Sequence, residues 1–289
     1  YIFFAKNIYR YINIKLYSKE LLKKLWKYSL PLIPNAISWW IFNSSDRIIV
    51  SSILGIGDNG ILSAAYKFSS VYITIYNIFN MTWTESASLH IDDKDNNKFF
   101  SKIIDTTLRL FTAICFGIIV CMPFIFPVMI NEKFGQAYNQ IPILMISSLF
   151  NVVVGLISVI YIAKKDTKAV AKTSICSAII NVVVNLALIK FVGLYAASIS
   201  TLAAYLIMSI YRMYDVRKYI KIDLNKKFVI SATVMIPIIF VCYYINNLYL
   251  NIIIILLVLV YAWLVNRKSV NLITNTIKEK FLKKGAQNG

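Results

Sequence analysis

Three charged residues, Asp46, Arg47 and Lys67, lie inside segments that are otherwise apolar. The run PNAISWWIFNSSDRIIVSSILG carries the first two, and SAAYKFSS carries the third after the glycine-containing turn GIGDNG. Ionisable groups in a membrane span are costly and generally face a bundle interior or a water-filled path. Two cations against one carboxylate leave surplus positive charge, and a guanidinium is well shaped to hold a phosphate. The hairpin therefore predicts a site for an anionic ligand.

The depth of the two cations within their helices indicates that they face the same space. Arg47 precedes Gly55 by eight residues, and Lys67 follows Gly60 by seven. At about 1.5 Å per residue, both lie on the order of 10 Å below the end of the hairpin. Because neighbouring side chains diverge on a helix, we expect Asp46 to pair with Lys67 or with a group on another helix. Alternatively, the cations extend to the outer interface and Asp46 is a structural partner.

The elements that must hold these residues are membrane-spanning helices. The chain is 58% hydrophobic and only 15% charged, with a mean hydropathy of +0.66, whereas soluble domains are about half apolar and a quarter charged. A span needs about 20 mostly apolar residues. The predicted fold class is therefore an all-α polytopic transmembrane helix bundle. Eight segments qualify as spans: 28–54, 61–84, 104–130, 138–163, 169–189, 191–213, 228–246 and 248–266.

The distribution of basic residues predicts the orientation of these spans. Of the 31 lysines and arginines, only Lys133 and Lys190 fall in the odd-numbered connections, and only Arg47, Lys67 and Arg109 fall within spans. The others, Arg212 included, are assigned to the even-numbered connections and the end segments. Because an excess of Lys and Arg marks the cytoplasmic side, both ends are expected to be cytoplasmic. The net charge of +18 then indicates attraction to anionic lipid rather than nucleic-acid binding.

Polar residues recur at helical spacing along the first six spans, which places them on one face of each helix. Ser, Thr and Asn often join membrane helices, but six such faces together with intramembrane cations favour a hydrated cavity. The last two spans lack a polar face and are expected to lie outside it. The residues predicted to line the cavity are Asp46, Arg47, Lys67, Asn43, Trp40, Ser70, Thr74, Asn77, Asn151, Asn181 and Asn185, with Asp105 and Arg109 as candidates whose i,i+4 spacing also fits a simple ion pair.

The sequence holds no group of residues that predicts catalysis. A membrane enzyme that builds glycans or lipids needs acid–base groups, a nucleophile or a metal cluster. The single histidine, His90, lies in ESASLHIDDKDNNK, whose acidic residues lack the glycine and closing glutamate of a calcium loop. No glycine-rich phosphate loop is present, and the four cysteines lie in apolar runs without ligand-like spacing. We therefore expect neither an enzyme nor a resident metal or cofactor.

The segment LPLIPNAISWWIFNSSDRIIVSSILGIGDNGILSAAYKFSSV resembles the polysaccharide flippase family (Wzx-type, polysaccharide biosynthesis) of the MOP exporter superfamily. The proline-containing start, NSSDR at 43–47, the short glycine turn and SAAYKFSS at 63–70 carry the resemblance. The segments at 141–189 and GLYAASISTLAAY at 193–205 resemble that family's tenth to twelfth helices.

The resemblance implies the second half of a longer carrier, in which a six-helix MOP/MATE-like lobe precedes two additional helices. Such a carrier moves an undecaprenyl-diphosphate-linked oligosaccharide to the outer leaflet by alternating access, for O-antigen, capsule or exopolysaccharide. Asp46, Arg47 and Lys67 would meet the diphosphate or acidic sugars, and the choice between Na⁺ and H⁺ coupling stays open. The implied partners are the missing N-terminal half, anionic lipids and glycan polymerase or export machinery, in a bacterial cytoplasmic membrane.

On this basis the chain divides into the end of a preceding helix with a basic linker at 1–27, a transport lobe at 28–213, a loop at 214–227, two further helices at 228–266 and a basic tail at 267–289. Three alternative functions are left open. A MATE-like cation-coupled drug antiporter would favour buried carboxylates. A membrane glycan polymerase or acyltransferase would need acid–base groups on a large outer loop. The third alternative is a scaffold subunit of a glycan assembly complex.

Overall fold

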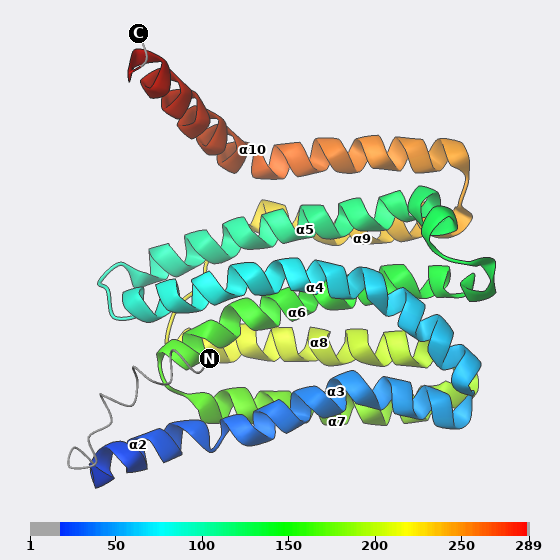
Figure 1. Ribbon diagram of the computed structural model, residues 1–289, viewed down its shortest axis with the longest axis horizontal. Coiled ribbons are helices and arrows are strands. Elements are labelled where there is room, and N and C mark those ends of the chain that lie inside the picture. Colours follow the sequence, from blue (N-terminus) through cyan, green and yellow to red (C-terminus); the bar gives the residue numbers. More distant parts are fainter. Residues whose placement is uncertain (1–17, 288–289) are drawn as a thin grey trace, which may run out of the picture.

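The structure is a computed structural model that describes the backbone of residues 18–287 and the side chains of residues 18–267 and 271. The predicted end of a preceding helix lies outside this range. Every regular element within it is helical, which confirms the all-α fold class (Figure 1). The elements are α2 (Lys19–Ser29), α3 (Leu32–Ile53), α4 (Ile56–His90), α5 (Asn96–Met129), η3 (Glu132–Phe134), α6 (Ala137–Ala163), α7 (Thr167–Val192), α8 (Tyr195–Asp215), η4 (Val216–Lys218), α9 (Lys226–Ile245) and α10 (Leu248–Gln287).

Six of the described helices, α5 to α10, are long and apolar enough to cross a membrane, so the chain is a multi-pass membrane protein. Helices α3 and α4 correspond to the other two predicted spans and have 22 and 35 residues. They are absent from the apolar set because the polar residues and charges of the hairpin lower their hydropathy. Helix α10 continues through the segment predicted as a tail.

The turn of the hairpin is shorter than predicted. Gly55 alone reverses the chain, at a φ of 120° that favours glycine. Helix α4 begins at the next residue and includes most of the predicted turn, with Asp58 in its first turn, where a carboxylate stabilises the helix dipole. Lys67 is therefore eleven residues into α4, roughly 16 Å at the rise of an α-helix.

The helices form a layered bundle in which neighbours in space are often distant in sequence. Helix α3 packs on α7, α7 on α8, α8 on α6 and α6 on α4, whereas α5 contacts α6, α9 and α10. Helices α3 and α4 meet near Gly55 and diverge towards their other ends (Figure 1). Helix α9 lies beside α5, and α10 lies beyond α5 on the side away from α3 and α7 (Figure 1).

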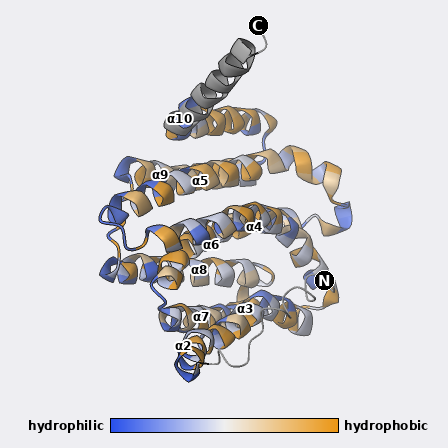
Figure 2. Ribbon diagram, turned by 60° about the vertical axis from the view of Figure 1, so that its left-hand side comes forward, coloured by the Kyte–Doolittle hydropathy of each residue, from blue (hydrophilic) through white to orange (hydrophobic). Residues whose placement is uncertain are grey.

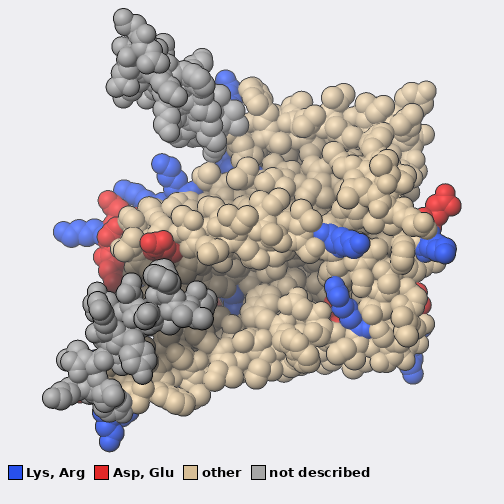
Figure 3. All heavy atoms as spheres, viewed as in Figure 1, with Lys and Arg blue, Asp and Glu red and all other residues tan. Residues whose placement is uncertain are grey.

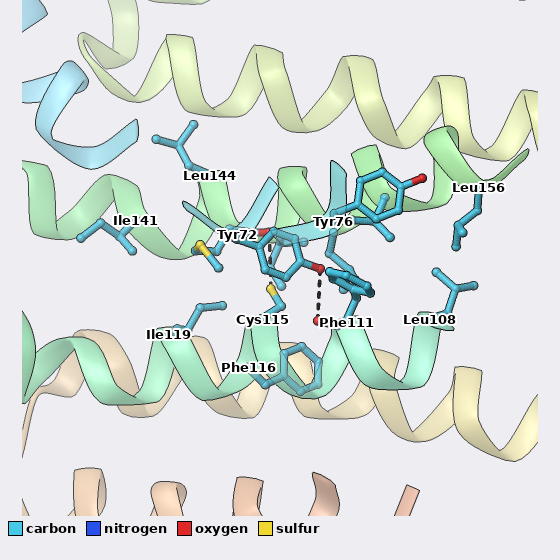
Figure 4. Close-up of a cluster of buried hydrophobic side chains, with 14 of the residues drawn as sticks. Tyr72, Tyr76, Leu108, Phe111, Cys115, Phe116, Ile119, Ile141, Leu144 and Leu156 are labelled. Carbon is cyan, nitrogen blue, oxygen red and sulfur yellow. Dashed lines mark hydrogen bonds between the residues drawn. The ribbon is translucent and has the colours of Figure 1, made fainter. Parts of the chain in front are cut away.

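Aromatic and aliphatic side chains of α4, α5 and α6 fill the centre of the bundle (Figure 4). Tyr72 donates a hydrogen bond from its hydroxyl to the carbonyl oxygen of Phe111, 3.1 Å away. Gly155 of α6 allows α4 to approach closely, because a Cβ built there would lie 2.8 Å from Cε1 of Tyr76. A smooth helix surface at this position therefore sets the distance between the two helices.

Charged side chains gather at the two ends of the bundle and leave a mostly uncharged band between them (Figure 3). The hydropathy colouring shows the same division, with apolar helix centres and polar connections (Figure 2). Basic side chains interrupt the band only over α3 and α4 on the face shown, and Arg47 and Lys67 are the only lysine or arginine residues of those helices. The two cations therefore stand apart from the rest of the basic charge.

A short segment after α8, residues 221–225, is fastened to the first turns of α5 and is here named the strap. Its backbone N–H groups at residues 221, 223 and 225 donate to side chains of α5 at distances of 3.0, 2.9 and 3.0 Å. The accepting residues, spaced by four, are Asn97, Ser101 and Asp105. Four helical residues span about 6 Å and two extended residues about 6.6 Å, so the two repeats match.

Candidate functional site

A cleft of about 370 Å³ lies between α3 and α4, above a floor formed by α6 and α8. It forms where the two hairpin helices diverge, so it follows from the way α3 packs on α7 while α4 packs on α6. The side chains that line it are Phe42, Asn43, Arg47, Ser63, Tyr66, Lys67, Ser69, Ser70, Ile73, Thr74, Ser147, Ser148, Asn151, Thr201 and Tyr205.

Two cations line this cleft without a matching anion. Arg47 and Lys67 are both exposed, and neither forms an ion pair with any residue in the described part of the chain. The guanidinium of Arg47 lies 6.0 Å from the centre of the Tyr66 ring. Lys67 also borders an adjoining hollow near the C-terminal end of α5, lined in part by Asn131 and Phe134. The cleft is therefore a cationic surface with room for an anion.

The remaining polar lining consists of hydroxyl and amide groups from α3, α4, α6 and α8. Ser70 and Thr74 donate to carbonyl oxygens of their own helix, at 2.8 Å in both cases, and Asn43 does so from its amide nitrogen. The hydroxyl oxygens keep lone pairs for a further donor. Such a lining can accept hydrogen bonds from a polyhydroxylated ligand.

Asp46 does not line the cleft but lies behind it, with 1% of its surface exposed. One carboxylate oxygen accepts hydrogen bonds from the hydroxyls of Tyr66 and Thr201, at 2.8 and 2.7 Å. The other accepts from the side-chain amide of Asn185, at 2.7 Å. Of the two predicted arrangements, the pair with Lys67 is wrong, and contact with groups on other helices is observed.

Oxygen atoms surround this carboxylate. Asn181 accepts a hydrogen bond from Ser45 at 2.9 Å and donates to Thr201 at 3.2 Å. The side-chain oxygen of Asn185 is buried and has no hydrogen-bond partner within the described residues. Asp46 is therefore a buried carboxyl group beside an unsatisfied carbonyl oxygen, and it forms no ion pair with any described residue.

The predicted site residues thus separate into groups. Asn43, Arg47, Lys67, Ser70, Thr74 and Asn151 line the cleft, whereas Asp46, Asn181 and Asn185 form a buried cluster at the contact of α3, α7 and α8. Trp40 and Asn77 are exposed and lie outside the cleft lining, one turn beyond it on α3 and α4. Tyr66 and Thr201 join both groups. The polar face of the sixth span contained Thr201, but nothing in the sequence singled out Tyr66.

Arg109 and Asp105 lie away from the cleft. Their side chains form an ion pair at 2.7 Å, and Arg109 also donates to the carbonyl oxygen of Val265 in α10. Asp105 in turn accepts from the N–H of Asn225 in the strap. The structure therefore supports the simple i,i+4 pair and gives these residues a role in holding α9 and α10 against α5.

Arg212 differs from its predicted place among the connecting residues. It lies within α8 and is fully buried. Its guanidinium donates to the hydroxyls of Thr173, Ser174 and Ser158 and to carbonyl oxygens of α6 and α7. Serine and threonine side chains of α6 and α7 accept these hydrogen bonds. Arg212 therefore lies in the protein interior and not in the connection to which the distribution of basic residues assigned it.

Comparisons with known proteins confirm the predicted resemblance. Residues 7–142 match the model of the family described as "Polysaccharide biosynthesis protein". No curated protein sequence matches the chain. An outward-facing multidrug resistance MATE family transporter of the MOP superfamily aligns with a TM-score of 0.60 and 14% identity, over 77% of this chain and 52% of that one. The lipid II flippase MurJ, in an inward closed conformation, aligns with a TM-score of 0.51 and 19% identity, over 78% and 53%.

These structural matches show the fold, which is that of the MOP transporters. The chain spans about half the length of both solved structures.

Proposed function

We propose, from the match of residues 7–142 to the polysaccharide biosynthesis family model and from the likeness of the fold to a lipid II flippase, that this chain is one lobe of a flippase for a lipid-linked oligosaccharide. The cargo would be a glycan on undecaprenyl diphosphate, moved from the cytoplasmic to the outer leaflet for a surface polysaccharide such as O-antigen, capsule or exopolysaccharide. The observation that carries this proposal is the cleft with two unpaired cations, Arg47 and Lys67.

The chemistry of the cleft fits the two polar parts of such a cargo. Arg47 supplies a planar fork of N–H donors suited to phosphate oxygens, and Lys67 adds a mobile point charge. The hydroxyl and amide groups of Ser70, Thr74 and Asn151 suit sugar hydroxyls. A drug cation would be repelled by the same cleft, which disfavours the multidrug alternative for this surface.

The buried cluster around Asp46 supports cation coupling. A carboxylate that leaves water without a counter-ion is costly, and either a proton or a bound cation removes that cost. The carboxylate and the free oxygen of Asn185 offer the oxygen ligands that hard cations prefer. Because Tyr66 and Thr201 contact Asp46 and also line the cleft, occupation of the cluster can change the cleft's shape. We infer that uptake of Na⁺ or H⁺ at Asp46 is linked to cargo movement.

The test of the cleft is substitution of its cations in the full-length transporter. Arg47→Ala and Lys67→Ala are expected to lower surface glycan at least about tenfold, because a charge-assisted hydrogen bond contributes about 1.5–3 kcal/mol. The matched control is Lys190→Ala, which removes an exposed lysine of α7 outside the cleft. Membrane insertion is followed by the amount of protein in the membrane fraction.

Wild-type glycan levels in both cleft variants would contradict the proposed cargo site. Loss of drug resistance instead of loss of surface glycan would favour the MATE-like antiporter. Accumulation of the lipid-linked glycan on the cytoplasmic side distinguishes a flippase from a polymerase or a scaffold subunit, which act after or beside translocation.

A further inference from the structure

A second depression, named here the α7–α8 groove, lies between those two helices and shares no lining residue with the cleft. Its volume is about 200 Å³. Most of its walls are apolar or weakly polar, and one end carries a lysine. The lining residues are Lys172, Thr173, Cys176, Ser177, Ile180, Ile207, Met208 and Tyr211.

The α7–α8 groove faces outward from two helices that qualify as membrane spans. Cys176, Ile207 and Tyr211 are exposed in this isolated chain. From Lys172 to Ile180 the groove follows eight residues of α7, about 12 Å at the rise of an α-helix. One leaflet of a bilayer is about 15 Å deep, so the groove has the length to hold much of one acyl chain.

Positive charge is concentrated at the end of the groove that the basic residues predict to be cytoplasmic. Lys168 and Lys172 are both exposed and lie one turn apart near the start of α7. Behind the wall of the groove, Nη2 of Arg212 lies 2.6 Å from the hydroxyl oxygen of Thr173, which itself lines the groove. Arg212 is fully buried and has no carboxylate partner within the described residues.

This arrangement attracts an anion more strongly than one surface lysine would. A charge held in a low-dielectric interior is poorly screened, so the field of Arg212 extends to the groove a few ångströms away. Its hydroxyl and carbonyl partners satisfy its N–H groups without cancelling its charge. The mouth of the groove is therefore an electropositive place beside an apolar channel.

We propose that the α7–α8 groove binds one acyl chain of an anionic phospholipid of the inner leaflet, with the lipid phosphate at Lys172. The apolar walls explain why the ligand is a lipid rather than free phosphate, since inorganic phosphate gains nothing from Ile180, Ile207 and Met208. The unneutralised Arg212 explains the preference for an anionic headgroup. This site is separate from the cleft and holds whether or not the cargo is a glycan lipid.

The experiment is native mass spectrometry of the full-length protein after incubation with phosphatidylglycerol or with phosphatidylcholine of the same acyl chains. We expect several-fold higher retention of phosphatidylglycerol. Lys172→Gln should lower that retention by removing the charge, and Cys176→Trp should lower it by filling the groove. Both positions are exposed, so the substitutions leave helix packing intact.

Two controls use the same helix. Lys190→Gln removes an exposed lysine at the other end of α7, and Ile179→Trp adds the same bulk at an exposed position outside the groove. Neither should change the retention of phosphatidylglycerol. Equal retention of the two lipids, or equal loss in Lys190→Gln and Lys172→Gln, would show a general lipid annulus and overturn the site. Displacement of the lipid by inorganic phosphate would overturn the acyl-chain contact.

Discussion

At the residue scale, Asp46 and Arg212 are an acidic and a basic residue, both buried and without ionic partners among the described residues. Arg212 is fully supplied with hydroxyl and carbonyl acceptors. Asp46 has three donors but lies beside an oxygen of Asn185 that lacks one. The hydrogen bonding of Arg212 is therefore complete, whereas the oxygen atoms of Asp46 and Asn185 can still bind a proton or a cation. That capacity is the physical basis of a coupling role.

Asp46→Asn is the direct test of that role. The amide keeps the shape and can hold part of the hydrogen-bond network, but it can neither take up a proton nor neutralise a cation. In proteoliposomes we expect transport that no longer responds to an imposed Na⁺ or pH gradient. Comparison of the two gradients in the unsubstituted protein identifies the coupling ion. Full gradient-driven transport in the variant would remove Asp46 from the mechanism.

Gly155 gives a prediction about packing. Gly155→Ala places a Cβ within 3 Å of the Tyr76 ring, so the buried ring or the spacing of α4 and α6 must change. Overpacking of this kind costs about 1–3 kcal/mol, and thermal unfolding in detergent should detect the loss. The control is Gly117→Ala in α5, where the added Cβ meets nothing within 4 Å. Equal stability of both variants would show that the α4–α6 contact is not set by this glycine.

The unusual charges of the hairpin are visible in the sequence, but the surroundings of each side chain are not. Asp46, Arg47 and Lys67 are conspicuous because ionisable residues are rare in apolar segments. Whether a helical residue faces a cleft or a neighbouring helix depends on the rotation of the helix, and the polar faces of α3 were too broad to fix it. Arg212 was assigned to a connection because a residue near a helix end carries no sign of burial in its own sequence.

At the element scale, a proline in one helix leaves a backbone carbonyl oxygen without its usual donor, and a side chain of another helix supplies one. Pro142 of α6 has no N–H to donate to the carbonyl oxygen of Tyr138 four residues earlier. The hydroxyl of Tyr243 in α9 donates to that oxygen at 2.7 Å, and the two tyrosine rings stack with centres 4.3 Å apart. The sequence shows Pro142 but not that Tyr243 compensates for it. Helices α6 and α9 are far apart along the chain and approach each other only in the folded structure.

Removal of that donor gives a test with an internal rescue. Tyr243→Phe is expected to destabilise the lobe by about 1–3 kcal/mol, the cost of an unsatisfied buried carbonyl. Adding Pro142→Ala should recover part of the loss because alanine supplies the missing N–H. Unfolding midpoints in detergent measure both effects.

The matched control is Tyr244→Phe. Its hydroxyl donates at 2.8 Å to the carbonyl oxygen of Asn139. Four residues later stands Ile143, which, unlike Pro142, has an N–H that can donate to this carbonyl. We expect little loss there. A double variant no more stable than Tyr243→Phe alone would show that the hydroxyl does not replace the bond lost at proline.

At the scale of the whole molecule, hydropathy and charge were sufficient to predict an all-helical membrane bundle. Long apolar runs define helices because the bilayer leaves few other ways to satisfy the backbone. The lengths of α4 and α5 were underestimated, since both continue as helix beyond their apolar parts. The order of packing, with α3 on α7 and α4 on α6, is known only from the structure. Helical periodicity shows which face of a helix is buried, but not which other helix packs on that face.

The orientation predicted from the basic residues can be tested with single cysteines. Lys133→Cys, in the connection between α5 and α6, should react with a membrane-impermeant maleimide added to intact cells. Asp93→Cys, in the connection between α4 and α5, should react only after permeabilisation. The unsubstituted protein corrects for its native cysteines. The reverse pattern would invert the chain in the membrane and place the α7–α8 groove in the outer leaflet.

The strap has a consequence for how this sequence can change over evolution. Three of its hydrogen bonds to α5 come from backbone N–H groups, so the identities of residues 221, 223 and 225 matter little to them. The length of the strap matters much more, because a single inserted residue would shift every later N–H out of step with the acceptors on α5. We therefore expect homologues to vary residues 221 to 224 while keeping the residue count of the segment, a constraint on spacing rather than on composition. Asn225 is the exception, because its side chain also accepts a hydrogen bond from the N–H of Phe228 at the start of α9.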